Sequence, residues 1–481
     1  MKLKELTKNL HITALHADPE TEISGISYDS RKTRPGDLFV AICGFTSDGH
    51  RFIPAAAENG AAVVLCERAP EQEIPYVQVE DARVGLALCS VAFYREPAKE
   101  MRMIGITGTS GKTTVSTILK HVLEENGKKV GLIGTNGIWI GQEEHPSSFT
   151  TPESLELQQL FRQMADAGCD TVVMEVSSHA LELKRVAGIL FETAIYTNLS
   201  QDHLDFHGTM EAYAAAKKKL FRACRFACIN ADDACAGKMA AAAQGEVLLY
   251  GTGENAALRA ENIRLFPDCV LFRAVWKEGS TEVIFPIPGS FSVSNALAVM
   301  AAAEREGIAP EYCAAALRTA KGVKGRLESV PTDGDYHIMI DYSHKPDALE
   351  KVLKSLRPAT RGRLICVFGC GGDRDRLKRP IMARIAAENA DYVILTSDNP
   401  RTEDPEAILD EIELGMAGQK TPYSRICRRE DAIAAAIGMA QDGDVILLAG
   451  KGHEDYQVVG HEKHHMDERE IVAETLAKRA R

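Results

Sequence analysis

The sequence of 481 residues lacks an apolar run long enough to cross a membrane, so we expect no membrane span. It also lacks a basic excess: the net charge is −12, which argues against the basic surface typical of nucleic-acid-binding proteins. The first residues, MKLKELTKNLHI, are charged and lack the apolar segment of a signal peptide, so we expect no secretory signal. Anionic small molecules remain possible because they need only local positive sites.

Cysteine pairs with metal-type spacing are also missing. None of the 12 cysteines belongs to a pair that a second Cys or His pair could complete into a zinc site. Several, such as Cys366 in LICVFG, lie in apolar runs and are expected in the core. Unpaired core cysteines favour a reducing compartment, so we expect a cytoplasmic protein.

Strands and helices alternate along most of the chain, which predicts an α/β protein with mostly parallel sheets. The length exceeds what one hydrophobic core usually serves, so two to four domains are expected. Two stretches are typical of linkers, YREPAKEM at 94–101 and the glycine-rich KGVKGRLESVPTDGDYH. We therefore predict three domains, over residues 1–98, 99–325 and 326–481.

GITGTSGKTT, at residues 105–114, is the strongest single motif. An apolar strand enters a glycine-rich turn that opens a helix, and the backbone N–H groups of such a turn can surround a phosphate. The strict P-loop pattern is not met, because Ile106 stands where its first glycine belongs. An ordinary glycine turn is the alternative, but Lys112 and Thr113 directly after Gly111 favour a phosphate site. The expected phosphate-binding residues are Gly108, Thr109, Ser110, Gly111, Lys112, Thr113 and Thr114.

Three further motifs carry charged groups that suit a metal or a phosphate. Glu175 in TVVMEV lies near the end of an apolar strand, where a buried carboxylate needs a metal ion or a salt bridge. TNLSQDHLDFHGT places two aspartates and two histidines within six residues, although each could simply be a turn or cap residue. YAAAKKKLF has three consecutive lysines, usually a solvated helix face, of which at most one or two can point at a site.

Four apolar runs in the last third of the chain end in charged or glycine-rich loops. HIMIDY, RLICVFG, DYVILTS and DVILLAG are followed by SHKPD, CGGDRDRLKRP, DNPRTEDP and KGHEDY. Ligands of open α/β sheets bind beyond the carboxyl ends of the strands, so we expect these loops to form one shared site. Asn295, in FSVSNALA, is a candidate nucleotide contact, although a helix cap is the simpler interpretation of this residue alone.

Taken in order, these motifs and YDSRKTRPGDLFVA, KGRLE and AGKGHEDY resemble the Mur ligase family over nearly the whole chain. The resemblance implies three α/β domains: an N-terminal UDP-sugar-binding domain, a central P-loop-type ATPase domain and a C-terminal Rossmann-like domain that binds the amino acid.

The sequence is most similar to the family members that add the third amino acid of the peptidoglycan precursor. This implies an ATP- and Mg²⁺-dependent ligase of cell-wall synthesis, expected to be monomeric. It would join meso-diaminopimelate to the D-glutamate side-chain carboxylate of UDP-N-acetylmuramoyl-L-alanyl-D-glutamate through an acyl phosphate. An enzyme that adds L-lysine, another Mur ligase and a folylpolyglutamate synthase-like ligase remain alternatives. A P-loop ATPase without ligase activity is the competitor from another class.

The resemblance also implies roles for particular residues. Catalysis is expected of Lys112, Glu175, His203 and Lys217. Metal binding is expected of Thr113, Glu175, His203 and Lys217, the last as a carbamate. Nucleotide contacts are expected from Asn295, Arg326 and Asp341. The UDP-linked substrate is expected to contact Tyr28, Ser30, Thr150, Thr151, Ser177 and Arg185. The amino acid is expected to contact Arg374, Asp398, Asn399, Pro400, Arg401, Gly450 and Glu454.

Arg401 bears on which amino acid is used. Diaminopimelate differs from lysine by a carboxylate at its far end, and a planar guanidinium binds a carboxylate through two parallel hydrogen bonds. Glu454 would take the distal ammonium. Two departures leave family contacts in doubt: Phe149 and Leu183 stand where some relatives have an asparagine and a glutamine.

Overall fold

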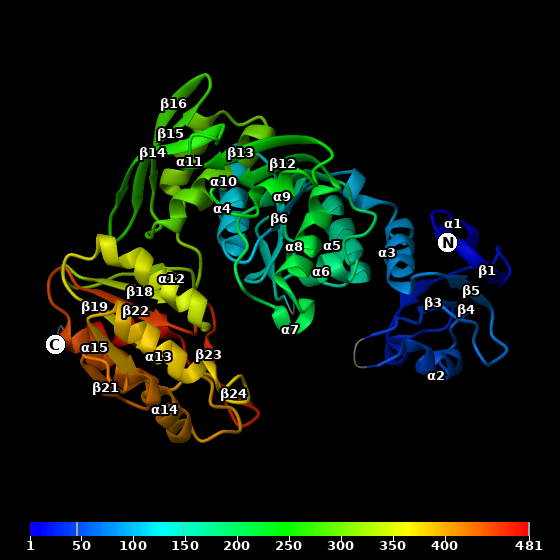
Figure 1. Cartoon of the computed structure of the whole chain (residues 1–481). Coiled ribbons are helices and arrows are strands. Elements are labelled where there is room, and N and C mark those ends of the chain that lie inside the picture. The colour runs from blue at the N-terminus through cyan, green and yellow to red at the C-terminus, as the bar shows by residue number, and fades with distance from the viewer. Residues whose placement is uncertain (45–46, 148, 480–481) are drawn as a thin grey trace. The chain divides into compact units, whose positions relative to one another are not determined.

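The computed structural model describes residues 1–44, 47–147 and 149–479. The chain divides into two compact units, Met1–Leu248 and Leu249–Arg481, and the boundary lies within strand β13 (Glu246–Gly251). Helices and mostly parallel strands alternate through both units (Figure 1), which confirms the predicted α/β class. The predicted domain limits near residues 98 and 325 stay predictions.

The N-terminal sheet has the strand order β1-β5-β4-β3-β2. Its strands are β1 (Ile12–His16), β2 (Gly25–Ser27), β3 (Asp37–Val40), β4 (Val63–Cys66) and β5 (Tyr76–Val79), and only β1 runs antiparallel. Its helices are α1 (Leu3–Leu6), α2 (Ile53–Glu58) and α3 (Ala82–Phe93), with short 3-10 turns at Ser30–Lys32, Gly49–Phe52 and Pro97–Lys99. Alternate strand residues face opposite sides. Leu38 and Val40 therefore join the core under α1 and α3, and Phe39 joins the core under α2.

The remaining strands of the first unit place the GITGTSGKTT motif at the middle of a parallel sheet. The order β12-β11-β6-β10-β7-β8-β9 combines β6 (Arg102–Thr107), β7 (Val130–Gly134), β8 (Gly137–Ile140), β9 (Glu143–His145), β10 (Thr171–Glu175), β11 (Phe191–Tyr196) and β12 (Cys224–Asn230). The helices are α4 (Lys112–Glu125), α5 (Ser154–Asp166), α6 (Ser178–Glu182), α7 (Leu204–His207), α8 (Met210–Phe221) and α9 (Ala236–Ala240). β6 pairs in parallel with both β10 and β11, with Glu175 opposite Ile106 and Tyr196 opposite Thr107. The loops after these three strands therefore lie at one edge of the sheet.

The second unit begins with an antiparallel meander and two helices. These are β14 (Leu258–Leu265), β15 (Val270–Trp276), β16 (Gly279–Phe285), α10 (Phe291–Arg305) and α11 (Pro310–Thr319). The small residues of α10, mostly alanines, are buried, which allows a close approach to the strands it covers.

The C-terminal sheet is doubly wound, in the order β17-β18-β22-β19-β20-β21. Its strands are β17 (Glu328–Val330), β18 (His337–Asp341), β19 (Leu364–Phe368), β20 (Tyr392–Leu395), β21 (Tyr423–Arg425) and β22 (Val445–Ala449), parallel from β18 onwards. One face packs against α12 (Pro346–Leu356), α13 (Lys378–Asn389) and α14 (Pro405–Glu413). The other packs against α15 (Arg429–Met439) and α16 (Glu468–Arg479). Short 3-10 turns at Arg357–Ala359 and Leu414–Met416 and a hairpin, β23 (Tyr456–Val459) and β24 (Glu462–His465), complete it.

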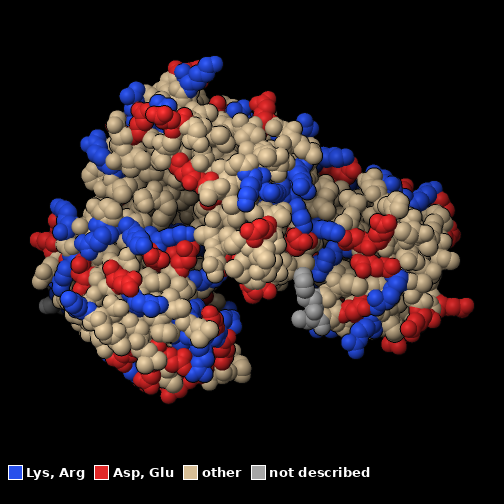
Figure 2. All heavy atoms as spheres, viewed as in Figure 1, with Lys and Arg blue, Asp and Glu red and all other residues tan. Residues whose placement is uncertain are grey.

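The described residues bear on three features raised by the sequence: membrane-spanning helices, surface charge and cysteine burial. Among the described helices, none has the length and apolar character that crossing a membrane requires. Acidic and basic side chains are interspersed over the face that Figure 2 shows, as the low basic content suggests. Cys366 is fully buried within β19, as its apolar surroundings predicted.

Candidate active site

The loop after β6 has the expected strand–turn–helix form. β6 ends at Thr107, α4 begins at Lys112, and Gly111 takes a left-handed backbone, with φ 87°, just before the helix. Gly108 allows a close approach: a Cβ added there would lie 1.8 Å from Thr197 Oγ1. The loop therefore presents backbone N–H groups at a helix N-terminus, the arrangement that favours an anion.

Two lysines converge on this loop. Lys112 Nζ donates to the carbonyl oxygens of Gly108 and Thr109, at 2.9 Å each. Lys217 Nζ, from α8, donates to the same Gly108 oxygen at 2.8 Å. Lys217 is 1% exposed, and burial, followed by the nearby charge of Lys112, lowers its pKa well below the ordinary lysine value. An uncharged amine is the form that reacts with CO₂, so the site suits the carbamate that the resemblance implied.

Glu175 ends β10 and is 1% exposed. Its Oε2 accepts from Thr113 Oγ1 at 3.1 Å and from Thr135 Oγ1 at 3.2 Å, and its Oε1 accepts from the Thr135 N–H at 2.9 Å. The carboxylate thus accepts hydrogen bonds from hydroxyl and amide groups, and within the part of the chain that the structure describes it forms no salt bridge of the kind considered as the alternative. The expected metal ligands Thr113 and Glu175 lie in direct contact.

Thr135 is a member of this cluster that sequence reasoning missed. It directly follows the buried strand β7, and its Oγ1 lies 3.0 Å from Thr150 Oγ1 as well as near Glu175. A polar residue just after an apolar strand was the available signal, the same one that identified the other strand-end loops.

An aromatic cluster holds the TNLSQDHLDFHGT segment against α8. His203 precedes α7 with a left-handed backbone, with φ 53°, and its ring centroid lies 4.8 Å from that of His179. Tyr213 stacks on His207 at 5.0 Å, and Lys217 Nζ lies 4.5 Å from the Tyr213 ring centroid. Burial lowers the pKa of both His179 and His207. His203 and Lys217, both expected at the metal, therefore border one cluster.

The expected contacts to the substrate peptide form a second network beside Glu175. Thr151 Oγ1 donates to the Glu175 carbonyl at 2.8 Å and accepts from the Ser177 N–H at 3.1 Å. Ser177 also caps α6 through its side chain, as the sequence had allowed. Arg185 Nη1 donates to the Thr151 carbonyl at 2.8 Å. The Arg185 guanidinium lies 5.5 Å from the ring centroid of Phe149, one of the two positions that depart from the family pattern.

Tyr28 and Ser30 lie in the N-terminal part of the first unit. Tyr28 donates through its hydroxyl to Glu156 Oε1 at 2.8 Å, and burial together with this carboxylate raises the pKa of the phenol. Ser30 is buried, and its carbonyl accepts from Asn59 Nδ2 at 2.8 Å. The Tyr28 hydroxyl group and the Ser30 backbone are thus held by hydrogen bonds, while the expected contacts of both residues with a UDP-sugar stay predictions.

Asn295 does not cap its helix. α10 begins at Phe291, so Asn295 is already within the helix, and it is 7% exposed. The simpler interpretation drawn from the sequence, a helix cap, is therefore wrong, because the helix starts earlier than the motif suggested.

Arg326 and Asp341 lie together in the C-terminal domain. Asp341 ends β18, its Oδ2 accepts from the Leu327 N–H at 2.8 Å, and burial raises the pKa of its carboxyl group. The Arg326 guanidinium lies 5.2 Å from the ring centroid of Tyr342, and His453 packs on the same tyrosine at 4.7 Å. Burial lowers the pKa of His453 to about 4, so its imidazole is neutral at physiological pH.

The four loops predicted to share a site do meet at one edge of the C-terminal sheet, since β18, β22, β19 and β20 are adjacent and parallel. The Gly450 N–H donates to the Asp341 carbonyl at 2.9 Å, and the Gly372 N–H donates to the Asn399 carbonyl at 2.9 Å. A Cβ on Gly450 would lie 2.6 Å from Asp398 Oδ2. Because of the strand order, the four loops, which are separate in the sequence, lie next to one another at this edge.

Asn399 and Glu454 are tied together by a buried lysine that sequence reasoning passed over. Asn399 Nδ2 donates to Glu454 Oε2 at 2.9 Å. Lys451, 0% exposed, donates to Asn399 Oδ1 at 2.9 Å and to Glu454 Oε2 at 3.0 Å. The only signal for Lys451 was its place between Gly450 and Glu454 in AGKGHEDY.

Arg401 and Arg374 flank Gly371, in the loop after β19. A Cβ on Gly371 would lie 2.8 Å from Arg401 Nη1 and 3.8 Å from Arg374 Cγ. Arg401 Nη1 donates to the Gly372 carbonyl at 2.7 Å, whereas Arg374 is exposed. Pro400, just before Arg401, is buried. The expected neighbourhood of the two arginines is therefore confirmed.

A cluster of Cys43, Asp48 and His50 also brings metal-type ligands together, within 4.8 Å of one another. His50 Nε2 accepts from the Glu67 N–H at 3.1 Å, so the ring proton lies on Nδ1, which contacts Asp48 Oδ1 at 2.8 Å. Burial raises the pKa of the Cys43 thiol to about 11. Both His50 ring nitrogens are thus already paired, one with the Glu67 N–H and one with Asp48, which is the arrangement of a hydrogen-bond network.

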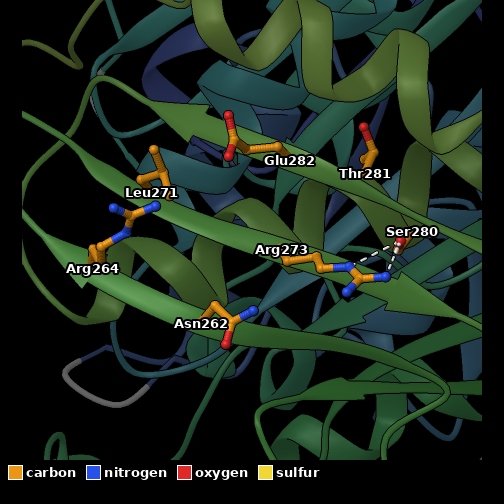
Figure 3. Close-up of a pocket in the computed structure, with 7 residues that line it drawn as sticks. All are labelled: Asn262, Arg264, Leu271, Arg273, Ser280, Thr281 and Glu282. Atoms are coloured by element: carbon orange, nitrogen blue, oxygen red, sulfur yellow. Dashed lines mark hydrogen bonds between the residues drawn. The ribbon is translucent and has the colours of Figure 1, made fainter.

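A depression of about 240 Å³ lies on the antiparallel meander, away from every predicted motif (Figure 3). It is lined by Asn262, Arg264, Leu271, Arg273, Ser280, Thr281 and Glu282. Arg273 already donates to Ser280 Oγ at 2.8 and 3.0 Å across it. None of the residues expected to act lines this depression.

Comparison with known proteins gives matches along most of the chain. The Mur ligase family, catalytic domain matches residues 22–93, the Mur ligase middle domain matches residues 106–303, and the Mur ligase, glutamate ligase domain matches residues 325–452.

Full-length relatives are similar as well. A protein of Clostridium acetobutylicum named UDP-N-acetylmuramoyl-L-alanyl-D-glutamate–2,6-diaminopimelate ligase 1 is 45% identical over 480 residues, covering 99% of each chain. The ligase of the same name, without the number, from Geobacillus kaustophilus is 42% identical over 488 residues, covering 100% of each. A solved structure with that ligase title superposes with a TM-score of 0.75 at 33% identity, over 100% of this chain and 99% of that one.

Proposed function

Because the chain belongs to the Mur ligase family, we propose that it joins meso-diaminopimelate to UDP-N-acetylmuramoyl-L-alanyl-D-glutamate, with ATP as the energy source. The observation that carries this proposal is the similarity, over 99% of the chain, to a relative named as the 2,6-diaminopimelate ligase. The gathering of Asn399, Arg401 and Glu454 at one sheet edge supports it.

The reaction forms one amide bond in two steps. The γ-phosphoryl group of ATP passes to the D-glutamate side-chain carboxylate, which gives an acyl phosphate and ADP. The amine of diaminopimelate then attacks the acyl carbon, and the tetrahedral intermediate expels inorganic phosphate while the nitrogen loses a proton. Lys112, directed at the loop carbonyls, is suited to hold the charge of the transferred phosphoryl group.

The chain offers a donor set that fits Mg²⁺, which prefers oxygen ligands. Thr113 supplies a hydroxyl group and Glu175 a carboxylate, 3.1 Å apart. A carbamate on Lys217 would add two further oxygens beside Gly108, and His203 joins the set by resemblance. A bound Mg²⁺ would neutralise phosphate charge, and these residues would orient it.

Arg401 supports diaminopimelate over lysine as the amino acid. Its guanidinium is held by Gly372 and is suited to a carboxylate, the group that lysine lacks. A site that leaves a buried polar group unpaired with the wrong substrate can discriminate by about 10⁴–10⁵-fold. We therefore expect strong preference for meso-diaminopimelate.

The test is phosphate release from ATP with each substrate withheld in turn, followed by a panel of amino acids. Release should require both the UDP-linked dipeptide and an amino acid, and diaminopimelate should be preferred. Release from ATP alone would support a non-ligase ATPase. Equal use of L-lysine would refute the diaminopimelate assignment while leaving a Mur ligase. Dependence on a folate in place of the UDP-linked dipeptide would support the folylpolyglutamate alternative.

A further inference from the structure

A buried ion pair lies behind the candidate amino-acid site. Arg429 begins α15 and Glu468 begins α16, and both side chains are 0% exposed. Arg429 Nε donates to Glu468 Oε1 at 2.8 Å. Removing two charges from water is costly, and their attraction alone often fails to repay that cost. The guanidinium therefore calls for a role beyond pairing with Glu468.

The other contacts of Arg429 are backbone carbonyls at strand ends. Nη2 donates to the Ala449 carbonyl at 2.9 Å, and Nη1 contacts the Ser397 carbonyl at 3.4 Å. Ala449 is the last residue of β22, and Ser397 lies just after β20. β19 separates these two strands in the sheet. One rigid guanidinium therefore connects the ends of two strands that are not direct neighbours in the sheet.

These two loops carry most of the expected amino-acid contacts. Ser397 directly precedes Asp398, and Ala449 directly precedes Gly450. Beyond these points the loops meet closely, because Asn399 Nδ2 donates to Glu454 Oε2 at 2.9 Å. A change in the spacing of the two carbonyls would be passed directly to these side chains.

We propose that Arg429, held by Glu468, is a positioning residue for the amino-acid site. It sets the distance between the loop of residues 398–401 and the loop of residues 450–454, and so sets affinity for the incoming amino acid without touching it. This inference rests on the proposed function of these loops.

A role confined to stability makes a different prediction. Replacing both members of a buried ion pair by apolar residues of similar size is often neutral or stabilising, whereas removing one member leaves a buried charge unpaired. The double variant Arg429→Met/Glu468→Leu therefore separates the two roles: it removes the carbonyl contacts without leaving an unpaired charge.

The experiment measures Tm and steady-state KM values for diaminopimelate and ATP in the full-length protein. For the double variant we expect a KM for diaminopimelate raised by at least about 10-fold, since misplacing substrate-holding groups by about 1 Å can cost 10²-fold. The KM for ATP should be unchanged. Arg429→Lys keeps the charge but lacks the planar fork, so it should also raise the KM for diaminopimelate.

Arg363→Met is the matched control. The Arg363 guanidinium, in the same domain, pairs with Asp444 Oδ2 at 2.7 Å, next to the opposite ends of β19 and β22. Its loss should lower Tm and leave both KM values unchanged.

Three outcomes decide the matter. A folded double variant with a wild-type KM for diaminopimelate would overturn the positioning role. If the double variant does not fold, a wild-type KM for Arg429→Lys would overturn it equally. If the unmodified enzyme does not use diaminopimelate, the proposed function fails instead, and the two failures are thereby distinguished.

Discussion

Arg401 adopts a backbone that non-glycine side chains rarely take, with φ 52°. Two backbone hydrogen bonds fix this conformation. The Arg401 N–H donates to the Val458 carbonyl at 3.0 Å, and the Arg401 carbonyl accepts from the Gly460 N–H at 2.7 Å. Strained conformations of this kind persist where the surroundings impose them, commonly at functional sites. The guanidinium is therefore presented from a fixed backbone.

Arg401→Ala should raise the KM for diaminopimelate about 10- to 100-fold, the loss expected for a charged hydrogen-bonded contact. The KM for ATP should stay near normal, and steady-state kinetics measure both. Arg428→Ala, which removes an exposed arginine of the same domain, serves as the control and should change neither value. An unchanged KM for diaminopimelate in Arg401→Ala would remove this arginine from the site.

His453 makes the stability of the protein depend on pH. Its pKa is about 4 in the folded chain, below the ordinary value of 6.5, because burial disfavours the charged ring. The unfolded chain therefore binds more protons between these values, so stability is complete above about pH 6.5 and is lost as pH falls towards 4. The contribution reaches at most about 3 kcal/mol.

His453→Gln should flatten this dependence, because glutamine does not titrate. The free energy of unfolding of both proteins is measured by urea unfolding at pH 7 and at pH 5. Between these two pH values it should fall more in the wild type than in the His453→Gln variant. An equal loss in both proteins would contradict the assignment.

At the scale of elements, loops after parallel strands carry most of the expected site residues, and glycines let these loops approach one another. Gly450 has φ 119°, and a Cβ there would also lie 2.6 Å from Asp398 Oδ2. Both backbone strain and crowding therefore oppose any larger residue at the end of β22.

Gly450→Ala should displace Asp398 and raise the KM for diaminopimelate, with a loss of stability of about 1–3 kcal/mol. Gly438→Ala is the control, because Gly438 lies in α15 and a Cβ there meets nothing within 4 Å. That substitution should stabilise the protein by about 0.5–1 kcal/mol and leave the kinetics unchanged. Both variants are compared by their KM for diaminopimelate and by thermal unfolding. If Gly450→Ala changed the KM and the stability no differently from Gly438→Ala, crowding at Gly450 would be refuted.

At the scale of the whole molecule, nucleotide binding should be linked to folding. A ligand that binds only the folded chain stabilises it by about 2.7 kcal/mol at a hundred times its Kd. A non-hydrolysable ATP analogue with Mg²⁺ should therefore raise Tm, and EDTA should remove most of the shift. The Lys112→Met variant should still fold, but the ATP analogue should no longer raise its Tm. A shift that survives EDTA unchanged would contradict the metal site of Thr113 and Glu175.

Much of the fold and part of the site were predictable from short sequence patterns. The strand, glycine turn and helix at residues 105–114 followed from local spacing, and so did the four polar strand-end loops. The alternative of a helix cap for Asn295 was wrong because helix ends depend on weak local preferences, whereas its expected nucleotide contact stays a prediction. Thr135 was missed although it directly follows an apolar strand, and Lys451 was missed because it becomes informative only beside Asn399 and Glu454.

The sequence by itself determined the elements, the family and the residue types at the strand ends, because these depend on patterns a few residues long. Only the tertiary structure decided which of them meet. Lys217 reaches Gly108 across 109 positions of sequence, and Arg379 is buried against Glu403, whose role the sequence left unassigned. Such contacts depend on strand order and on the burial of whole helices, and these are properties of the complete fold that no short stretch of sequence contains.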